Sequence, residues 1–293
     1  MKISVVIPAY NAEKTLPSLL ESLSTQSIKG FEAIVVDDCS TDTTPCIARS
    51  YECRLIRLGE NHGPAHARNI GAGEATGDIL AFSDGDCRVA KDWLKNIEEN
   101  LSPNDCEALM GRLSLLPSTF LGDSISALGF PAGGSIGFDK IWRVDANGFT
   151  NSISSCNCAI KRDVFREIGG FDESFPYAGG EDSLLAYRLT EMGFRIKYCP
   201  EVLVYHDARD SFRDFLRWQF RRGISSYIFS TKVTNKKDFV SLRLWSTRNI
   251  MRRYCTDNKF PLILFLLATG FFVQYIAYLF ASYKRTFYAG VNH

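Results

Sequence analysis

The chain lacks a net charge of either sign. Its 34 Lys and Arg residues are nearly balanced by 33 Asp and Glu residues, so the formal net charge is only +1. So small a charge creates no broad basic field of the kind that gathers nucleic acid. The basic residues are unevenly spread, however, because residues 209–253 are crowded with Arg and Lys and precede an apolar stretch. This asymmetry favours contact with a membrane surface over contact with DNA.

The chain also lacks the cysteine spacing of zinc and redox sites. It has nine cysteines, but none forms a CxxC pair, and the closest two, Cys156 and Cys158, are separated by one residue. We expect reduced, mostly buried thiols in a cytosolic domain, without zinc. The apolar run before Pro8 is too short for a signal peptide, which supports the same compartment.

Neither a Walker loop nor a GxGxxG motif is present, and no internal repeat or low-complexity tract interrupts the chain. With 293 residues, 45% of them hydrophobic, the chain can form one large domain, alone or with an extension. In the first third, β-branched apolar runs alternate with segments of helical periodicity. We expect strands within 3–11, 31–40, 53–58 and 77–86, and helices within 13–26, 41–51 and 63–75. This alternation predicts an α/β fold with a parallel sheet covered on both faces.

Polar residues follow three of the expected strands. They are Pro8, Tyr10 and Asn11 after the first strand, Asp37 and Asp38 at the end of the second, and Asp84 and Asp86 at the end of the fourth. One Asp pair after a strand is more often a turn former than a ligand, but several acidic strand ends in one sheet are harder to explain as turns. Ligands bind beyond the carboxyl ends of such strands, so the acids should meet at one edge. Crowded carboxylates favour a hard divalent cation and a phosphate-bearing ligand, and Arg68 offers a partner for a diphosphate.

Five motifs together resemble the family 2 glycosyltransferases. In chain order they are VVIPAYN, VVDDCSTD, NHGPAHARNIGA, FSDGD and GGFDESFPYAGGEDSLLAYRL, and the resemblance covers residues 1–223. It implies a GT-A fold, which is a Rossmann-like, mostly parallel sheet flanked by helices. It also implies an inverting enzyme that uses a nucleotide-diphosphate sugar and a divalent cation, Mn²⁺ or Mg²⁺.

The resemblance assigns roles to residues of the expected sheet edge. SDGD corresponds to the family's DxD motif, so Asp86 is expected to bind the metal and Asp84 to face the ribose or the same ion. His206, after a late strand, is the expected further metal ligand, although a lone histidine there is more often structural. The remaining nucleotide-sugar residues implied are Pro8, Tyr10 and Asn11 around the nucleotide, Asp38 toward the base, and Arg68 near the nucleotide and its phosphates.

The segment 180–193 predicts a helix that begins with two acids, Glu181 and Asp182. Leu184, Leu185, Leu189 and Met192 mark its expected buried face, and Gly193 its expected end. On sequence alone, acids in a first turn are ordinarily partners of the helix dipole. The resemblance instead makes Asp182 the catalytic base that takes a proton from the acceptor hydroxyl. Glu181 is the next candidate.

The segment RWQFRRG departs from the family's QxxRW element. Gln219 and Arg222 have the right spacing, but Gly223 stands where the tryptophan would be. The departure puts processive polymer synthesis in doubt and favours transfer of one sugar per encounter. The sugar pocket is expected to come from residues 113–151, which carry no recognisable motif.

Residues 260–280 form an apolar stretch long enough to cross a bilayer, with basic residues at both ends. We therefore divide the chain into a GT-A domain, 1–223, with a nucleotide-sugar half (1–100) and an acceptor half (101–223), and a membrane-associating region, 224–293. Aromatic and basic residues of 209–253 are expected to lie against anionic lipid. The alternative for 260–280 is an interfacial or oligomer-forming helix. The catalytic domain would stay in the cytoplasm at the inner face of the cell membrane.

The predicted function is transfer of a single sugar, from a UDP-sugar by default, to a hydroxyl of a lipid-linked or cell-surface glycan precursor, without a nucleic acid partner. Two other classes compete with it. A nucleotidyltransferase should carry a basic, glycine-rich loop after its first strand, which PAYNAEKT is not. A non-catalytic nucleotide-sugar-binding protein should lack one of the acids, whereas the DxD and ED elements are both intact.

Overall fold

The computed structural model describes residues 1–102, 105–234 and 236–291, and its centre is a nine-stranded sheet. The strand order is β3-β2-β1-β4-β8-β6-β9-β5, with β7 paired beside β9. The strands are β1 Ile3–Ala9, β2 Glu32–Asp37, β3 Arg54–Arg57, β4 Ile79–Ser83, β5 Cys87–Val89, β6 Ala108–Leu115, β7 Phe149–Thr150, β8 Asn157–Lys161 and β9 Ile196–His206. Strands β1 to β4 are parallel, as predicted, whereas β8 runs antiparallel to both of its neighbours.

The strand order creates a switch point between β1 and β4. From β1 the chain moves outward to β2 and β3, and then returns across β1 to form β4 on its other side. The connecting helices are α1 Leu16–Ser24, α2 Thr44–Arg49 and α3 Pro64–Glu74. Because such crossovers are right-handed, α1 and α2 share one face of the sheet and α3 covers the other. The carboxyl ends of β1 and β4 therefore flank a crevice, the usual position of ligands in this architecture.

Helical periodicity predicted the buried face of α1 correctly, since Leu16, Leu19, Leu20 and Leu23 all lie in the core. The helices of the second half are α4 Trp93–Leu101, α5 Phe120–Ser126, α6 Phe138–Ile141, α7 Arg162–Glu167, α8 Glu181–Glu191, α9 Phe212–Lys232, α10 Lys236–Tyr254 and α11 Phe260–Val291. The prediction for Met192 was wrong, because α8 ends one residue earlier and the Met192 side chain is 48% exposed. Gly193 follows with a positive φ of 84°, as expected at a helix end.

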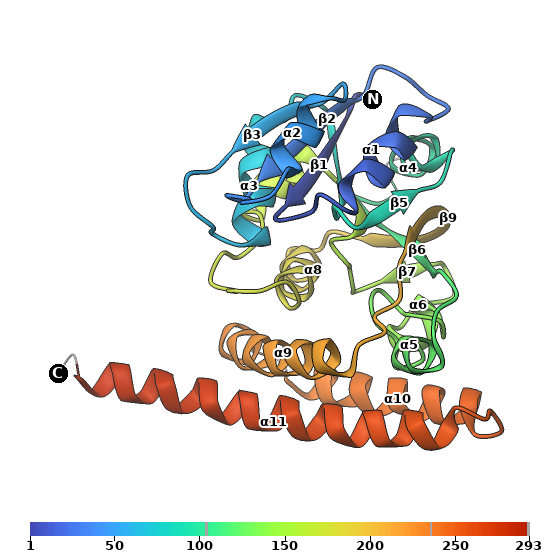
Figure 1. Cartoon of the computed structure of the whole chain (residues 1–293), viewed down its shortest axis with the longest axis vertical. Helices are drawn as coiled ribbons and strands as arrows, with labels where there is room; N and C mark the ends of the chain where they lie inside the picture. The colour runs from blue at the N-terminus through green and yellow to red at the C-terminus, as the bar shows by residue number, and fades with distance from the viewer. Residues whose placement is uncertain (103–104, 235, 292–293) are drawn as a thin grey trace.

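Helices α9, α10 and α11 form a layer on the side of α8 away from the sheet (Figure 1). The boundary predicted between residues 223 and 224 falls inside α9, which continues from Phe212 to Lys232. Helix α9 contacts α8 as well as α11, so it belongs to both parts of the chain. Asp172 contributes to this connection, because its carboxylate pairs with Arg188 of α8 and with Lys232 at the end of α9.

Gly223 lies at a close contact between α9 and α11. A Cβ atom at this position would come within 2.3 Å of the carbonyl oxygen of Gln274 and 2.6 Å of the Ala277 side chain. A side chain as large as tryptophan has no room here, which explains the departure from QxxRW. Gln219, one turn earlier, accepts a hydrogen bond from the Gln274 side chain. Gly223, which departs from the family pattern, and Gln219, which keeps it, thus both contact α11.

Some aromatic residues of α9, which were predicted to face lipid, are packed inside the protein. Phe215 is completely buried in a cluster that includes Ile263 and Leu266 of α11. Trp218 packs edge to face on Phe130. These side chains form a core between α9, α11 and the 113–151 segment, so that part of the lipid-contact prediction was wrong. Periodicity alone could not separate the two faces, because both carry aromatic residues.

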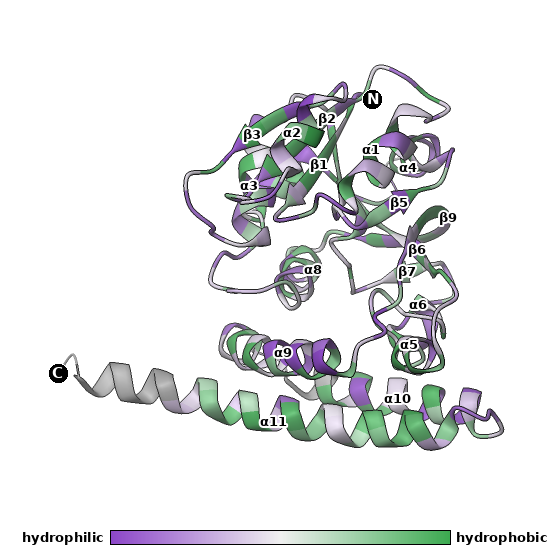
Figure 2. Ribbon diagram, viewed as in Figure 1, coloured by the Kyte–Doolittle hydropathy of each residue, from purple (hydrophilic) through white to green (hydrophobic). Residues whose placement is uncertain are grey.

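The opposite face of α11 remains apolar and exposed. Its outward side chains include Phe265, Phe271, Phe272, Tyr275, Ile276, Leu279 and Phe280. Figure 2 shows the apolar character extending along most of this helix. Within the described residues, one helix, at Phe260–Tyr283, is long and apolar enough to cross a membrane, and 22% of its most apolar window is buried.

Substituting Gly223 with Ala should force α9 and α11 apart. We expect G223A to lower the free energy of unfolding by about 1 to 3 kcal/mol, the usual cost of overpacking. Gly73 is the matched control, since it also lies in a helix but a Cβ atom there meets nothing within 4 Å. We expect G73A to be neutral or stabilising by up to about 1 kcal/mol. Thermal unfolding of both variants in detergent tests this, and equal midpoints would contradict the close contact.

Candidate active site

A cleft of about 780 Å³ opens at the carboxyl ends of β1 and β4 and extends to α8, α9 and α10. All nine residues predicted for the site line it: Pro8, Tyr10, Asn11, Asp38, Arg68, Asp84, Asp86, Asp182 and His206. Residues of the 113–151 segment, expected to build the sugar pocket, also line it: Phe130, Pro131, Ala132, Ile141 and Trp142. The strand ends and the later motifs therefore meet in one place.

Arg68 lies beneath the cleft and joins its acidic residues. The side chain is 1% exposed, and its two terminal nitrogens donate to Asp84 at 2.6 Å and to Glu181 at 3.2 Å. Burial by itself lowers the pKa of Arg68, but the charges of these two acids outweigh it and raise that pKa. Both terminal nitrogens have carboxylate partners, so Arg68 joins Asp84 to Glu181. Its expected place near the nucleotide phosphates stays a prediction.

The two acids at the start of α8 have different environments. Glu181 is buried and accepts hydrogen bonds from Arg68 and from the backbone of Gly179. Burial, followed by the charge of Asp182, raises the pKa of Glu181 although Arg68 opposes the shift. Asp182 accepts hydrogen bonds from Gly180 and Ser183, all of them at Oδ1. Within the described residues Oδ2 accepts none, so this oxygen is available to take a proton.

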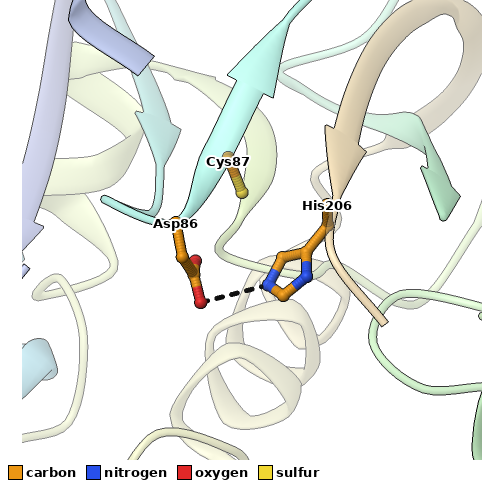
Figure 3. A group of neighbouring side chains, drawn as sticks. All are labelled: Asp86, Cys87 and His206. Atoms are coloured by element: carbon orange, nitrogen blue, oxygen red, sulfur yellow. Dashed lines mark ion pairs between the residues drawn. The ribbon is translucent and has the colours of Figure 1, made fainter. Parts of the chain in front are cut away.

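Asp86, Cys87 and His206 point toward one another (Figure 3), and their ligand atoms lie within 4.8 Å of each other. The Nε2 atom of His206 is 3.2 Å from the Asp86 carboxylate. The Nδ1 atom is 2.6 Å from the carbonyl oxygen of Asp207, which can only accept, so Nδ1 carries the proton. Nε2 thus faces Asp86 and is the nitrogen that can bind a metal.

These residues fit a hard divalent cation. Burial by itself raises the pKa of Asp86, but the hydrogen bond and charge of His206 outweigh it and hold that pKa below its usual range. A carboxylate oxygen and an imidazole nitrogen are donors that Mn²⁺ accepts. A hydrogen bond with Cys156, together with burial, raises the pKa of Cys87 well above its usual range. Cys87 is therefore a neutral thiol, not the thiolate that a soft metal would need.

The residues expected around the nucleotide form a connected loop structure. Both carboxylate oxygens of Asp38 accept backbone hydrogen bonds, at 2.9 Å from His62 and 2.8 Å from Gly63. Asn11 has a positive φ of 49° and accepts a hydrogen bond from the backbone of Thr41. These bonds tie the loop after β1 to the loop after β2, and the β2 loop to the start of α3. Their direct contact with a nucleotide stays a prediction.

Sequence reasoning missed several residues that α9, α10 and the segment before α9 bring to the cleft. Arg209, Trp218, Arg221, Arg222 and Arg243 all line it. The basic composition of 209–253 was noted, but all of it was expected to lie against lipid. For the arginines that line the cleft this expectation was wrong, and the packing of α9 and α10 partly buries two of them, Arg222 and Arg243. The QxxR spacing was the one available signal, and it marked Arg222.

Removing Arg68 should leave Glu181 buried without a cation. We expect R68Q to lower the free energy of unfolding by about 3 to 5 kcal/mol, as is usual when one partner of a buried ion pair is removed. The control is R54Q, which breaks a half-exposed pair with Glu74 and should cost about 1 kcal/mol or less. Chemical unfolding measures both. Similar losses in the two variants would show that Arg68 does not support the acids.

Known proteins share this fold and sequence pattern. The chain is 27% identical over 233 residues to the glycosyltransferase AglE of Haloferax volcanii, covering 75% of this chain and 71% of AglE. The structure resembles TarS residues 1–349 of S. aureus in complex with UDP, with a TM-score of 0.58, 20% identity and coverage of 98% and 92%. TarS is named a poly(ribitol-phosphate) β-N-acetylglucosaminyltransferase.

It also resembles the mannosyltransferase PcManGT of Pyrobaculum calidifontis in complex with GDP-Man and Mn²⁺, with a TM-score of 0.59, 21% identity and coverage of 96% and 83%. These likenesses show the GT-A fold. The model of glycosyl transferase family 2 matches residues 4–169, more than half of the chain, and that of glycosyl transferase family group 2 matches 133–290. The chain therefore belongs to glycosyl transferase family 2.

Proposed function

We propose that this glycosyltransferase transfers a single sugar, with inversion, from a UDP-sugar to a hydroxyl of a lipid-linked or cell-surface glycan precursor. One observation carries the proposal: the acids after β4, His206 and the acids of α8 line one cleft, where Arg68 joins Asp84 to Glu181 and His206 pairs with Asp86. A donor diphosphate and an acceptor hydroxyl can both be reached from such a site. The occurrence of UDP in TarS supports the choice of nucleotide.

Asp182 is the proposed catalytic base. Its Oδ1 atom is fixed by Gly180 and Ser183, which directs the other carboxylate oxygen toward a hydroxyl in the cleft. Removal of the hydroxyl proton lets that oxygen attack the anomeric carbon from the side opposite the nucleotide, and one such displacement inverts the centre. Asp86 and His206 would hold a divalent cation, which stabilises the negative charge of the departing nucleoside diphosphate.

Two other classes have less support. A nucleotidyltransferase needs a basic phosphate-binding loop after the first strand, but the residues after β1 are Tyr10, Asn11 and Ala12. A binding protein without catalysis has no need for a base, whereas Asp182 lines the cleft together with Asp84 and Asp86. Slow, metal-dependent release of UDP from a UDP-sugar would support the transferase alone. Absence of this release across a panel of UDP-sugars would favour the binding protein.

The membrane proposal rests on the exposed apolar face of α11. Because the opposite face packs along α9, we propose that α11 keeps the catalytic domain at the inner face of the cell membrane through its outward side chains. An enzyme held at this surface and a lipid-linked acceptor are confined to the same membrane. The competing explanation is that the apolar faces of α11 from two or more copies of the chain pack together. A protein that is a soluble oligomer without detergent would support this explanation.

The metal proposal predicts that D86A and excess EDTA each weaken UDP binding and abolish donor hydrolysis, because the diphosphate charge is then left uncompensated. Isothermal titration with UDP and an assay of UDP release measure the two effects. D163A, an exposed acid on α7, is the control and should behave like the wild type. Full activity in excess EDTA would remove the metal from the mechanism.

The base proposal predicts that D182N keeps near-normal donor affinity but lowers kcat by about 10² or more, since a positioned base contributes a factor of this size. E191Q, an exposed acid at the other end of α8, should leave kcat unchanged. Steady-state kinetics with one UDP-sugar gives kcat and the KM for the donor separately. A D182N enzyme that retained half of its turnover would assign the base elsewhere.

The membrane proposal predicts that replacing Phe271, Phe272 and Tyr275 together by Gln lowers binding to vesicles by more than about tenfold, because three exposed apolar side chains lose their transfer energy. M192Q, which changes an exposed apolar side chain just after α8, is the control. Co-sedimentation with vesicles that contain anionic lipid measures the bound fraction. Unchanged binding of the triple variant would overturn the proposal.

A further inference from the structure

The part of the cleft that α9 and α10 form is cationic. Its lining includes Arg221, Arg222, Ser225 and Ser226 of α9, with Arg243 and Ser246 of α10. The metal site lies elsewhere in the cleft, at the ends of β4 and β9. The proposed roles of Asp182, Asp86 and His206 use none of these arginines. Their placement requires a separate explanation.

Arg222 is arranged as an anion-binding group. Its guanidinium carbon lies 4.0 Å from the centroid of the Phe130 ring and 5.2 Å from that of Trp218, so two aromatic rings fix its position. The Nε atom is shielded from solvent and has no hydrogen-bond partner among the described residues. Burial, followed by the charge of Arg243, lowers the pKa of Arg222 to about 9. A bound anion would offset both the burial of the Arg222 charge and its repulsion by Arg243.

Arg243 supplies the second cation and connects it to the apolar helix. Its Nη1 atom donates to the side chain of Gln274 on α11 at 3.0 Å. Burial lowers the pKa of Arg243 to about 10. The charges of Asp182 and Glu181 act on Arg222, so Arg222 lies within electrostatic reach of the proposed base, and the charge of Arg243 acts on Arg222 in turn. An anion held here would lie near the attacking hydroxyl.

We propose that Arg222 and Arg243 bind the phosphate or diphosphate group through which a lipid-linked acceptor is attached to its lipid. The proposal rests on the proposed transferase function and names the acceptor class for the same cleft. The link from Arg243 to Gln274 places this anion site one side chain from α11, whose outer face is apolar and exposed. A lipid phosphate at a membrane surface fits both the arginines and the apolar face of α11. Its charged phosphate needs cations, while its hydrocarbon chain stays in apolar surroundings.

Binding of dodecyl phosphate to the full chain in non-ionic detergent tests the site, with dodecanol and inorganic phosphate as comparison probes. We expect dodecyl phosphate to bind at least about tenfold more tightly than either, and R222Q and R243Q each to lose about tenfold or more. R213Q on α9 and R248Q on α10 remove exposed arginines and should lose less than about twofold. Affinity for UDP with Mn²⁺ should stay within about twofold in all four variants.

The outcomes separate the two proposals. A wild-type chain that fails to bind UDP with Mn²⁺ contradicts the transferase function, whatever dodecyl phosphate does. Loss of UDP affinity in R222Q and R243Q with unchanged dodecyl phosphate binding would place the arginines at the donor and overturn the inference. Equal affinity for inorganic phosphate would make it a site for soluble anions, which also overturns it. If R222Q unfolds, the variants R222K and R243Q replace it in the test. Lys keeps the positive charge but loses the planar, bidentate geometry of the guanidinium group.

Discussion

The geometry of the site depends on the ion pairs of Arg68. This side chain is almost fully buried, and its charge is compensated by Asp84, which follows β4, and by Glu181 at the start of α8, 113 residues after Arg68. A buried cation without these partners would cost several kcal/mol. The start of α8 is therefore fixed to the end of β4 within the cleft.

The same pairs give neighbouring acids different partners. Glu181 and Asp84 face Arg68, so their carboxylates are already neutralised. Asp182 and Asp86, one and two residues away, line the same cleft without contacting Arg68, and Asp86 pairs with His206. Acids at the ends of buried strands are tolerable where a cation lies beside them, as Arg68 does beside Asp84 and Arg57 beside Asp37.

Helices α9 to α11 complete the cleft on the side away from the sheet. Their packing depends on Gly223, where α11 comes too close for any side chain, and on the buried Phe215. The same crossing leaves one face of α11 apolar and exposed and turns Arg222 and Arg243 inward. Attachment to a membrane and recognition of an anion would thus depend on one contact between helices.

Local patterns in the sequence were enough for much of this protein. Alternating periods predicted β1 to β4 and their helices, and the order of short motifs predicted the family and nine residues, all of which line the cleft. Such signals work because strand ends and helix starts are encoded by residues close together in the chain.

Only the tertiary structure decided what these residues do to one another. The sequence does not show that Arg68 joins Asp84 to Glu181, because these acids come from separate segments of the chain. From the sequence alone, Gly223 is a departure from a motif, and its cause is the contact with α11. The stretch 209–253 was predicted to lie against lipid, but four of its arginines line the cleft: Arg209, Arg221, Arg222 and Arg243. Each of these depends on long-range packing, which fixes the face of a helix that is buried and the charge that lies beside it, and which no local pattern records.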